Sequence, residues 1–238
     1  MDEVRGRCAW LCHDEMLKRM KRQSGQTPLH VLCQNASITA PALAILLGAT
    51  PVSAVMCDKH SNLAIHYLCQ NANCTLDMLQ LLGQPDTYIM KNDDSRTPLH
   101  CLAASPFKKD VFLYLLQHCP DAASVIDRDG RSVLHWVCDS GHASAALVSA
   151  LLPVTANAPC KVDQHMDLPL HLLCQNRAVS SEILKSLLQV NPESIYNRTE
   201  NTAAAIPDTV RTALEFYTGW QLMTVAQTFS TVRPHCIY

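Results

Sequence analysis

Residues 127–142 read DRDGRSVLHWVCDSGH, and the centre of this stretch returns along the chain at a nearly constant interval. Each copy contains a short phrase that ends in a histidine, as in Thr27-Pro-Leu-His30 and Thr97-Pro-Leu-His100. These histidines are His30, His66, His100, His135 and His171, spaced 36, 34, 35 and 36 residues apart. A leucine pair recurs at the same period, at positions 46/47, 81/82, 115/116, 151/152 and 187/188. Two independent markers at one period predict a solenoid of stacked repeats.

Each repeat is predicted to contain two helices. Thr27 and Thr97 are good N-caps, and prolines at 28, 98 and 169 stand where a helix does not need an N–H group. Apolar residues then follow at helical spacing, so a short first helix is expected there. A longer second run, such as residues 182–188, should end before the prolines at 51, 85, 120 and 192. With only 5% aromatic residues and seven glycines, the class is predicted to be all-α.

Polar segments lead from each second helix to the next cap. They are Asp58–Asn62, Asn92–Arg96, Asp127–Arg131 and Asp163–Asp167. Together with the repeated phrase they resemble the ankyrin repeat, whose pattern runs Asp-x-x-Gly-x-Thr-Pro-Leu-His, two small residues, then Gly-His. The copy from Asp127 to His142 is the closest match, and the resemblance covers about residues 22–201.

The chain departs from the ankyrin pattern at several places. Its period is one to three residues longer than about 33, and leucine or valine with cysteine replaces the alanine pair. The turn glycine is kept only at Gly25 and Gly130. Other residues occupy this position in the remaining copies: Ser61, Ser95, Met166 and Glu200. If the backbone keeps a positive φ there, each replacement carries strain.

The expected architecture is a helix-turn-helix solenoid of five repeats and a degenerate sixth, with helical caps. Residues 1–22 are expected to form an N-terminal helical cap, 23–201 the repeats, and 202–238 the degenerate copy, Thr202–Ala205, with a C-terminal helical cap. Helical spacing of Val210, Leu214 and Tyr217 favours that cap. Alternatively, four aromatic residues near this end form a docking surface: Phe216, Tyr217, Trp220 and Phe229.

Composition narrows the expected partners and location. The net charge is −2, which gives no general attraction to nucleic acid or anionic lipid. No apolar run approaches the roughly 18 residues of a membrane span, and the N-terminus lacks a signal-peptide pattern. We therefore expect a soluble, cytoplasmic protein, with a nuclear location also open, and reduced thiols at the twelve cysteines.

The repeated His-x-x-Cys pairs invite a metal-site interpretation. Equivalent helices of stacked repeats pack about 8–10 Å apart, whereas zinc ligands lie within about 4 Å of one another. We therefore predict no metal and no cofactor, with the cysteines filling the core. The resemblance implies that the histidines tie neighbouring turns together by hydrogen bonds. No phosphate-binding or hydrolase motif is found, so an enzyme is not expected.

The ankyrin resemblance implies a non-catalytic scaffold or adaptor that binds a partner protein on a concave face, where variable side chains are exposed. The candidate contact residues are Gln34, Lys59, His60, Asn62, Gln70, Asp94, Arg96, Asp129, Arg131, Asp139, Gln164, His165, Asp167 and Gln175. Two alternatives are open: a targeting or regulatory segment of a larger enzyme or signalling protein, and a thiol or metal sensor that uses Cys8 and Cys12. The partner's identity and the oligomeric state are left open.

Overall fold

The computed structural model describes residues 24–106, 109–155, 158–175 and 180–191. Within these ranges the chain forms eleven α-helices and no strand, which confirms the all-α prediction. The only β pairing in the described part is one antiparallel bridge between Ile126 and Ser132.

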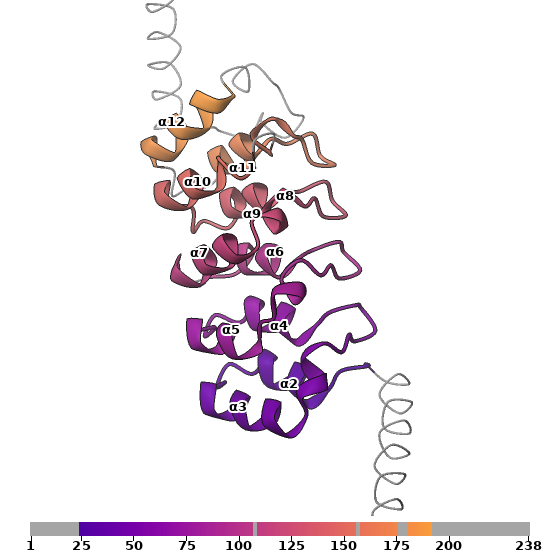
Figure 1. Cartoon of the computed structure of the whole chain (residues 1–238). Coiled ribbons are helices and arrows are strands. Elements are labelled where there is room, and N and C mark those ends of the chain that lie inside the picture. The colour runs from indigo at the N-terminus through magenta and orange to yellow at the C-terminus, as the bar shows by residue number, and fades with distance from the viewer. Residues whose placement is uncertain (1–23, 107–108, 156–157, 176–179, 192–238) are drawn as a thin grey trace, which may run out of the picture.

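The helices are arranged as stacked antiparallel pairs. The pairs are α2 (Pro28–Gln34) with α3 (Ala40–Ala49), α4 (Ala64–Gln70) with α5 (Leu76–Leu82), α6 (Pro98–Ala103) with α7 (Lys109–His118), α9 (Val133–Asp139) with α10 (Ala145–Leu151), and α11 (Pro169–Gln175) with α12 (Ser181–Val190). First helices contact first helices of the next pair, and second helices contact second helices. Loops project from the side opposite the second helices (Figure 1).

The repeated histidine caps the start of every first helix. Its Nδ1 accepts a hydrogen bond from the backbone N–H three residues earlier. The donors are Thr27 (3.0 Å), Leu63 (3.0 Å), Thr97 (3.3 Å), Ser132 (3.1 Å) and Leu168 (3.0 Å). In the first copy Thr27 Oγ1 also accepts from the His30 N–H, which completes a capping box in which histidine takes the usual place of glutamate. The Thr-Pro-Leu-His phrase is thus a helix-start signal.

Prolines end the second helices, as the sequence predicts. Pro51 begins a 3₁₀ turn (Pro51–Ala54) directly after α3, and Pro85 begins another (Pro85–Thr87) after α5. Pro120 follows α7 and precedes the short helix α8 (Asp121–Ser124). A third 3₁₀ turn covers Ala158–Cys160. Pro192 lies outside the described residues.

One apolar core runs the length of the stack. It contains residues from every helix pair, including Leu29, Leu68, Phe112, Leu134 and Leu173. Six of the ten paired leucines are buried, whereas Leu46, Leu47, Leu81 and Leu152 are partly or fully exposed. No helix in the described part of the chain is long and apolar enough to cross a membrane. The expected caps, residues 1–22 and 202–238, and the degenerate copy Thr202–Ala205 lie outside the described residues.

Candidate functional site

The polar segments Asp58–Asn62, Asn92–Arg96, Asp127–Arg131 and Asp163–Asp167, called fingers below, share one internal fold. The side-chain Oδ1 of the first residue accepts the backbone N–H groups two and four positions later. In the first finger Asp58 Oδ1 accepts from His60 and Asn62, both at 2.9 Å. Asn92, Asp127 and Asp163 repeat this arrangement. The recurring aspartate or asparagine therefore shapes each loop from within.

The fourth residue of every finger has a positive φ, as does Gly25 before the first repeat. The φ angles are 70° at Gly25, 60° at Ser61, 59° at Ser95, 78° at Gly130 and 60° at Met166. At Gly25 an added Cβ would lie 2.8 Å from the backbone nitrogen of Lys59, so glycine is required for space as well as conformation. Ser61, Ser95 and Met166 adopt this conformation with a side chain, which carries the strain expected from the sequence.

Each finger is joined to its neighbour by a backbone hydrogen bond. Lys59 N donates to Ser24 O at 3.3 Å, and Asp93 N donates to His60 O at 3.0 Å. The series continues with Arg128 N to Asp94 O at 2.8 Å and Gln164 N to Asp129 O at 2.9 Å. These bonds hold the fingers in a continuous row along the side of the stack that Figure 1 shows opposite the second helices.

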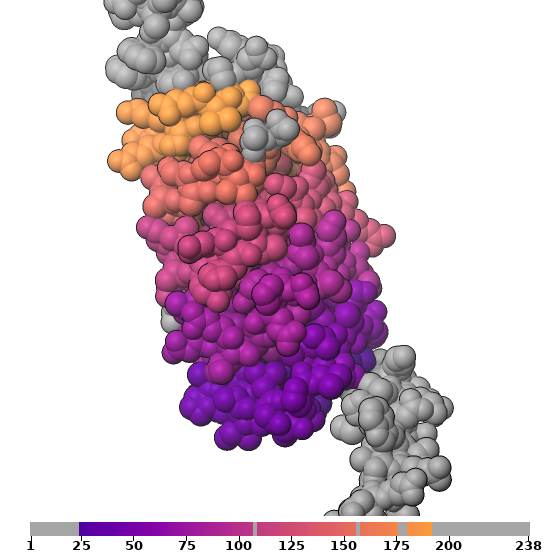
Figure 2. All heavy atoms as spheres, viewed as in Figure 1, coloured from indigo at the N-terminus to yellow at the C-terminus, as the bar shows by residue number. Residues whose placement is uncertain are grey.

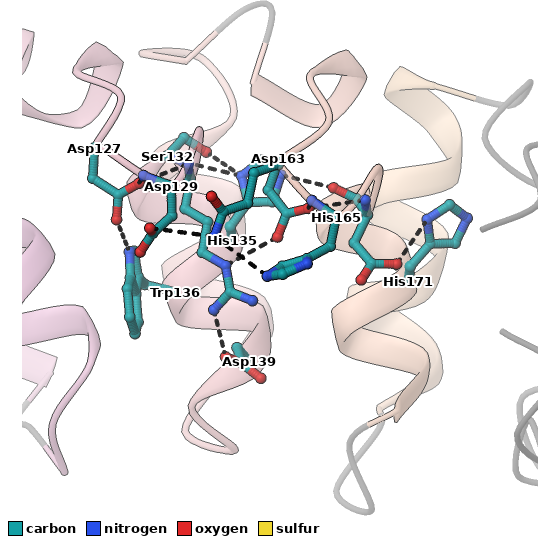
Figure 3. Close-up of polar contacts among 12 residues, drawn as sticks. Asp127, Asp129, Ser132, His135, Trp136, Asp139, Asp163, His165 and His171 are labelled. Atoms are coloured by element: carbon teal, nitrogen blue, oxygen red, sulfur yellow. Dashed lines mark hydrogen bonds and ion pairs between the residues drawn. The ribbon is translucent and has the colours of Figure 1, made fainter. Parts of the chain in front are cut away.

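Trp136, in α9, lies between two arginines from successive fingers. The guanidinium carbon of Arg96 is 4.5 Å from the centroid of the Trp136 ring, and that of Arg131 is 5.3 Å from it. Such placements over an indole are favourable cation–π contacts. The indole Nε1 donates to Asp127 Oδ2 at 2.9 Å (Figure 3), and Arg96 Nε donates to the same oxygen at 3.3 Å.

Both arginines bridge two carboxylates. Arg96 reaches Asp129 at 3.1 Å in addition to Asp127. Arg131 pairs with Asp163 of the next finger at 3.0 Å and with Asp139 at the end of α9 at 3.1 Å. Burial alone raises the pKa of Asp163, but the N–H groups of Asp167 and His165 and the Arg131 guanidinium outweigh burial and hold that pKa below its ordinary value. Asp127, Asp129 and Asp163 therefore act as charged ties between successive fingers, whereas the Arg131–Asp139 pair lies within one repeat.

Tyr67 occupies the position of Trp136 in an earlier repeat and makes the matching contact. Its hydroxyl donates to Asp58 Oδ2 at 2.6 Å and accepts from Gln26 Nε2 at 3.1 Å. Sequence reasoning missed both aromatic residues. The available signal was an aromatic ring with a polar atom directly after the repeated histidine, opposite an aspartate at the start of the same finger.

A protein-family model described as ankyrin repeats (3 copies) matches residues 65–157 and 99–201. The chain belongs to the ankyrin repeat family. The two matches together span residues 65–201, more than half of the 238-residue chain. The pair α2–α3 precedes the matched span, yet it has the same histidine cap as the later ankyrin repeats, and the residue two positions before Thr27, Gly25, has a positive φ as the fourth residue of each finger does. No curated protein matches the chain.

Most of the predicted contact residues lie on the accessible part of this ankyrin stack. Nine are exposed: Gln34, Lys59, His60, Gln70, Asp94, Asp139, Gln164, His165 and Gln175. Arg96, Asp129 and Arg131 are partly buried in the arginine–carboxylate ties. The structure brings the finger residues into one row, with Gln34, Gln70, Asp139 and Gln175 at the ends of first helices beside it.

The prediction that Asn62 and Asp167 are exposed contact residues is wrong, because both are buried. Only 8% of Asn62 and 4% of Asp167 are accessible. Each is the last residue of its finger, and its carbonyl accepts the Nε2–H of the histidine one repeat earlier. These distances are 3.0 Å from His30 to Asn62 and 3.3 Å from His135 to Asp167. Both residues therefore belong to the ankyrin scaffold.

Within the described residues, three of the repeated histidines form the expected hydrogen bond to the next repeat, whereas His100 does not. His66 Nε2 bonds to Met90 O at 3.1 Å, alongside the two bonds described above. His100 Nε2 is buried without a hydrogen-bond partner in the described part of the chain; the carbonyls of Val125 and Arg131 lie near its ring without reaching hydrogen-bond geometry. Burial lowers the pKa of His66 and of His100 to about 4, so both rings are neutral at pH 7.

The buried cysteines of the His-x-x-Cys pairs fill the core. Burial raises the pKa of Cys33 to about 12 and that of Cys174 to about 11, and it also raises the pKa values of Cys69 and Cys138 well above the ordinary thiol value. Such thiols are poor nucleophiles and poor metal ligands. Among the described residues, no group of three or more His, Cys, Asp or Glu side chains is placed to hold a metal ion. The N-terminal Cys8 and Cys12 lie outside these residues.

Proposed function

We propose that the chain is a non-catalytic protein-recognition module, an ankyrin solenoid of five repeats and a degenerate sixth that binds a partner on its finger side. The finger side comprises the four fingers and the exposed ends of the first helices. The observation that carries this proposal is the row of inter-finger backbone hydrogen bonds, which fixes the loops before any partner arrives. A preformed surface loses little conformational freedom on binding, which favours affinity.

The side chains presented by this row support a protein partner. The second and third positions of the fingers hold Lys59 and His60, then Asp93 and Asp94, then Arg128 and Asp129, then Gln164 and His165. The first and fourth positions, in contrast, are constrained by the internal hydrogen bonds and the positive φ. Charges of both signs with polar side chains favour a protein over a nucleic acid, which would select a positively charged surface.

Trp136 is the expected energetic centre of this surface. It is partly exposed, and Arg96 and Arg131 hold its ring in a fixed orientation. Tryptophan and arginine are the residues most often found to dominate binding energy at protein interfaces. Asp139 lies one helical turn further along α9 and adds an exposed carboxylate beside them.

A pair of matched triple variants tests which side binds. The finger-side variant is Lys59→Glu, Asp94→Lys and His165→Glu, all at exposed positions. The control is Gln80→Glu, Gln117→Lys and Lys185→Gln on the second helices, which gives the same net charge change of −1. Both variants should melt close to wild type, because exposed substitutions usually change stability by at most about 0.5 kcal/mol each.

Proteins retained by the immobilised wild-type chain are compared with those retained by each variant, and a retained protein is then purified and titrated. We expect the finger-side variant to bind it at least about tenfold more weakly, equivalent to about 1.4 kcal/mol, and the control to bind as wild type. Weaker binding by the control, with the finger-side variant binding as wild type, would place the interface on the second-helix side. A partner that binds both variants as tightly as wild type would contradict the finger-side assignment.

A further inference from the structure

The residues directly before the fingers form a surface that the finger-side proposal does not use. At one and three positions before each finger the side chains are exposed, except for the partly buried Ile126. These eight residues are called the flank strip below: Val55 and Cys57, Ile89 and Lys91, Ser124 and Ile126, and Cys160 and Val162. On the face that Figure 2 shows, the repeats follow one another without interruption from the indigo end to the orange end. Equivalent positions of successive repeats therefore succeed one another along the stack.

Exposed apolar side chains are concentrated on this strip and beside it. Ten large hydrophobic residues are exposed in the described part of the chain, and five of them are found here: Val52, Val55, Ile89, Met90 and Val162. Both cysteines that are exposed among the described residues, Cys57 and Cys160, also belong to the strip. Cysteine is one of the residue types most often buried. Apolar side chains that gather on one surface, rather than being scattered singly, mark a site of interaction.

The strip is hollowed between the third and fourth fingers. A cavity of about 230 Å³ lies there, and its lining includes Ile126, Val154 and Lys161. Ser124 Oγ donates to Val154 O at 3.3 Å, so the segments that precede the two fingers touch beside the cavity. Pockets for drug-sized ligands measure about 300–1,000 Å³. The cavity is therefore better suited to one side chain of another protein than to a separate small molecule.

The charge of the strip is opposite to that of the fingers beside it. Among the three residues that precede each finger, Lys91 and Lys161 are the only charged ones, and both are exposed. Neither ammonium group takes part in a hydrogen bond or ion pair within the described residues. The four fingers, in contrast, hold seven aspartates against one lysine and three arginines. An acidic segment is therefore attracted to the strip and repelled by the fingers.

We propose that the flank strip binds a segment of a partner protein that carries both apolar and acidic side chains. One large apolar side chain of that segment fills the cavity, and its carboxylates pair with Lys91 and Lys161. Successive repeats lie about 8–10 Å apart. This spacing matches about seven residues of helix or about three residues of extended chain, so the segment's apolar residues should recur at one of these intervals. The finger-side function does not depend on this interface.

An anionic membrane surface also attracts lysine and apolar side chains, but the strip fits it poorly. Sites that recognise acidic lipids contain about four to eight lysines and arginines, whereas the strip and its edge contain two. The described residues as a whole hold thirteen acidic and eight basic side chains, so their net charge opposes approach to such a surface. A protein segment, which contacts the strip alone, avoids this repulsion.

Peptide selection on the intact chain tests the proposal. A display library of random peptides of about 15 residues, long enough to span two repeats as a helix, is selected against the immobilised protein. Enriched peptides are synthesised and titrated by fluorescence anisotropy. Peptides that combine Asp or Glu with large apolar residues should be enriched. A bound peptide should also slow the reaction of Cys160 with iodoacetamide, because Cys160 directly precedes Lys161 at the cavity.

Matched pairs of substitutions show where these peptides bind. Lys91→Glu with Lys161→Glu should weaken binding at least about tenfold, because charge attraction becomes repulsion. Ile89→Asp should also weaken binding, without changing either lysine. The control is Lys109→Glu with Lys185→Glu, which makes the same change in net charge at exposed positions of α7 and α12 and should bind as wild type. Circular dichroism checks that every variant is folded.

Failure to enrich any peptide would overturn the inference, as would peptides that bind the Lys91→Glu, Lys161→Glu pair as tightly as wild type. Equal weakening by the control pair would show a general effect of charge and would also contradict it. Peptides weakened instead by Asp94→Lys would bind at the fingers, which supports the finger-side function and not this one. Binding of the chain to phosphatidylserine vesicles, lost in the Lys91→Glu, Lys161→Glu pair, would assign the strip to a membrane.

Discussion

Trp136 and Asp127 are joined by a 2.9 Å hydrogen bond from the indole Nε1 to the carboxylate Oδ2, and they lie nine residues apart in one repeat. Tyr67 and Asp58 form the same relationship at 2.6 Å, also nine residues apart. In both repeats an aromatic ring of the first helix holds the first residue of its own finger. In the repeat that contains Trp136, Arg96 of the preceding finger also donates to Asp127 Oδ2. This one oxygen therefore holds its own finger and joins that finger to the one before it.

Replacing Arg131 by alanine should lower the free energy of unfolding by about 1–3 kcal/mol, because it leaves the carboxylate of Asp163 without its charge partner. That carboxylate is fully buried, and an uncompensated buried charge is costly. Arg128→Ala is the control, since Arg128 is an exposed residue of the same finger and should change stability by at most about 0.5 kcal/mol. Urea unfolding measures both, and equal effects would contradict a structural role for Arg131.

Met166→Gly should stabilise the protein by up to about 1 kcal/mol. Met166 has a φ of 60°, which costs roughly 1–2 kcal/mol for a residue with a Cβ, partly offset by the greater freedom of glycine in the unfolded chain. Little apolar burial is lost, because Met166 is 64% exposed. Met166→Ala keeps the strain and should be close to neutral. Thermal melts that rank alanine above glycine would refute the strain argument.

His66→Ala should destabilise the stack by roughly 1–3 kcal/mol, because it removes the cap at Leu63 N and leaves Met90 O unpaired. Hydrogen exchange should therefore accelerate in its own repeat and in the next finger. His100→Ala provides the comparison: His100 makes no bond to the next repeat within the described residues, so the acceleration should stay in its own repeat. Identical exchange patterns in the two variants would argue against this difference.

Stability should fall as the pH is lowered from about 6.5 to about 4. Burial lowers the pKa of His66 and of His100 to about 4, compared with about 6.5 in an unfolded chain, although hydrogen bonds to the rings partly oppose this effect. In that window the unfolded state binds more protons, so acid favours unfolding. Asp58 and Asp163, whose pKa values are lowered, add a further loss only below about 3.8. Urea midpoints at pH 7.5, 6, 5 and 4.5 test this, and a flat profile would contradict it.

The thiols should divide into two classes on treatment with iodoacetamide at pH 8. Cys57 and Cys160 are exposed and should react in the native protein. Cys33 and Cys174 should stay unmodified until urea is added, because both are buried and burial raises their pKa values to about 12 and about 11. Mass spectrometry of peptides gives the sites. Native modification of Cys33 would show that the core opens readily.

The repeat unit could be predicted from sequence because its determinants are local. The capping phrase, the prolines after the second helices and the positive φ at Ser61 and Ser95 each depend on residues within one turn. Burial of Asn62 and Asp167 could not be predicted in this way. It depends on contact with a histidine 32 residues earlier, across a stacking geometry that no single copy encodes.

The candidate site shows the same division. Exposed finger residues such as Lys59 and His165 could be found as variable positions in a recurring pattern. Arg96 and Arg131 looked equally variable, yet their side chains are committed to carboxylates in the following finger. Charge alone does not distinguish a side chain that is available to contact another protein from one that is already paired within the chain.

The backbone bonds between fingers also bear on how the chain folds. Each joins residues about one repeat apart, as in Gln164 and Asp129, whose separation is 35 residues. The length of the chain loop that must close is therefore about the same at every junction. Contact order thus stays low however many repeats are stacked. Folding can start at any two adjacent repeats and spread toward both ends, so lengthening the array should slow the initiating step very little.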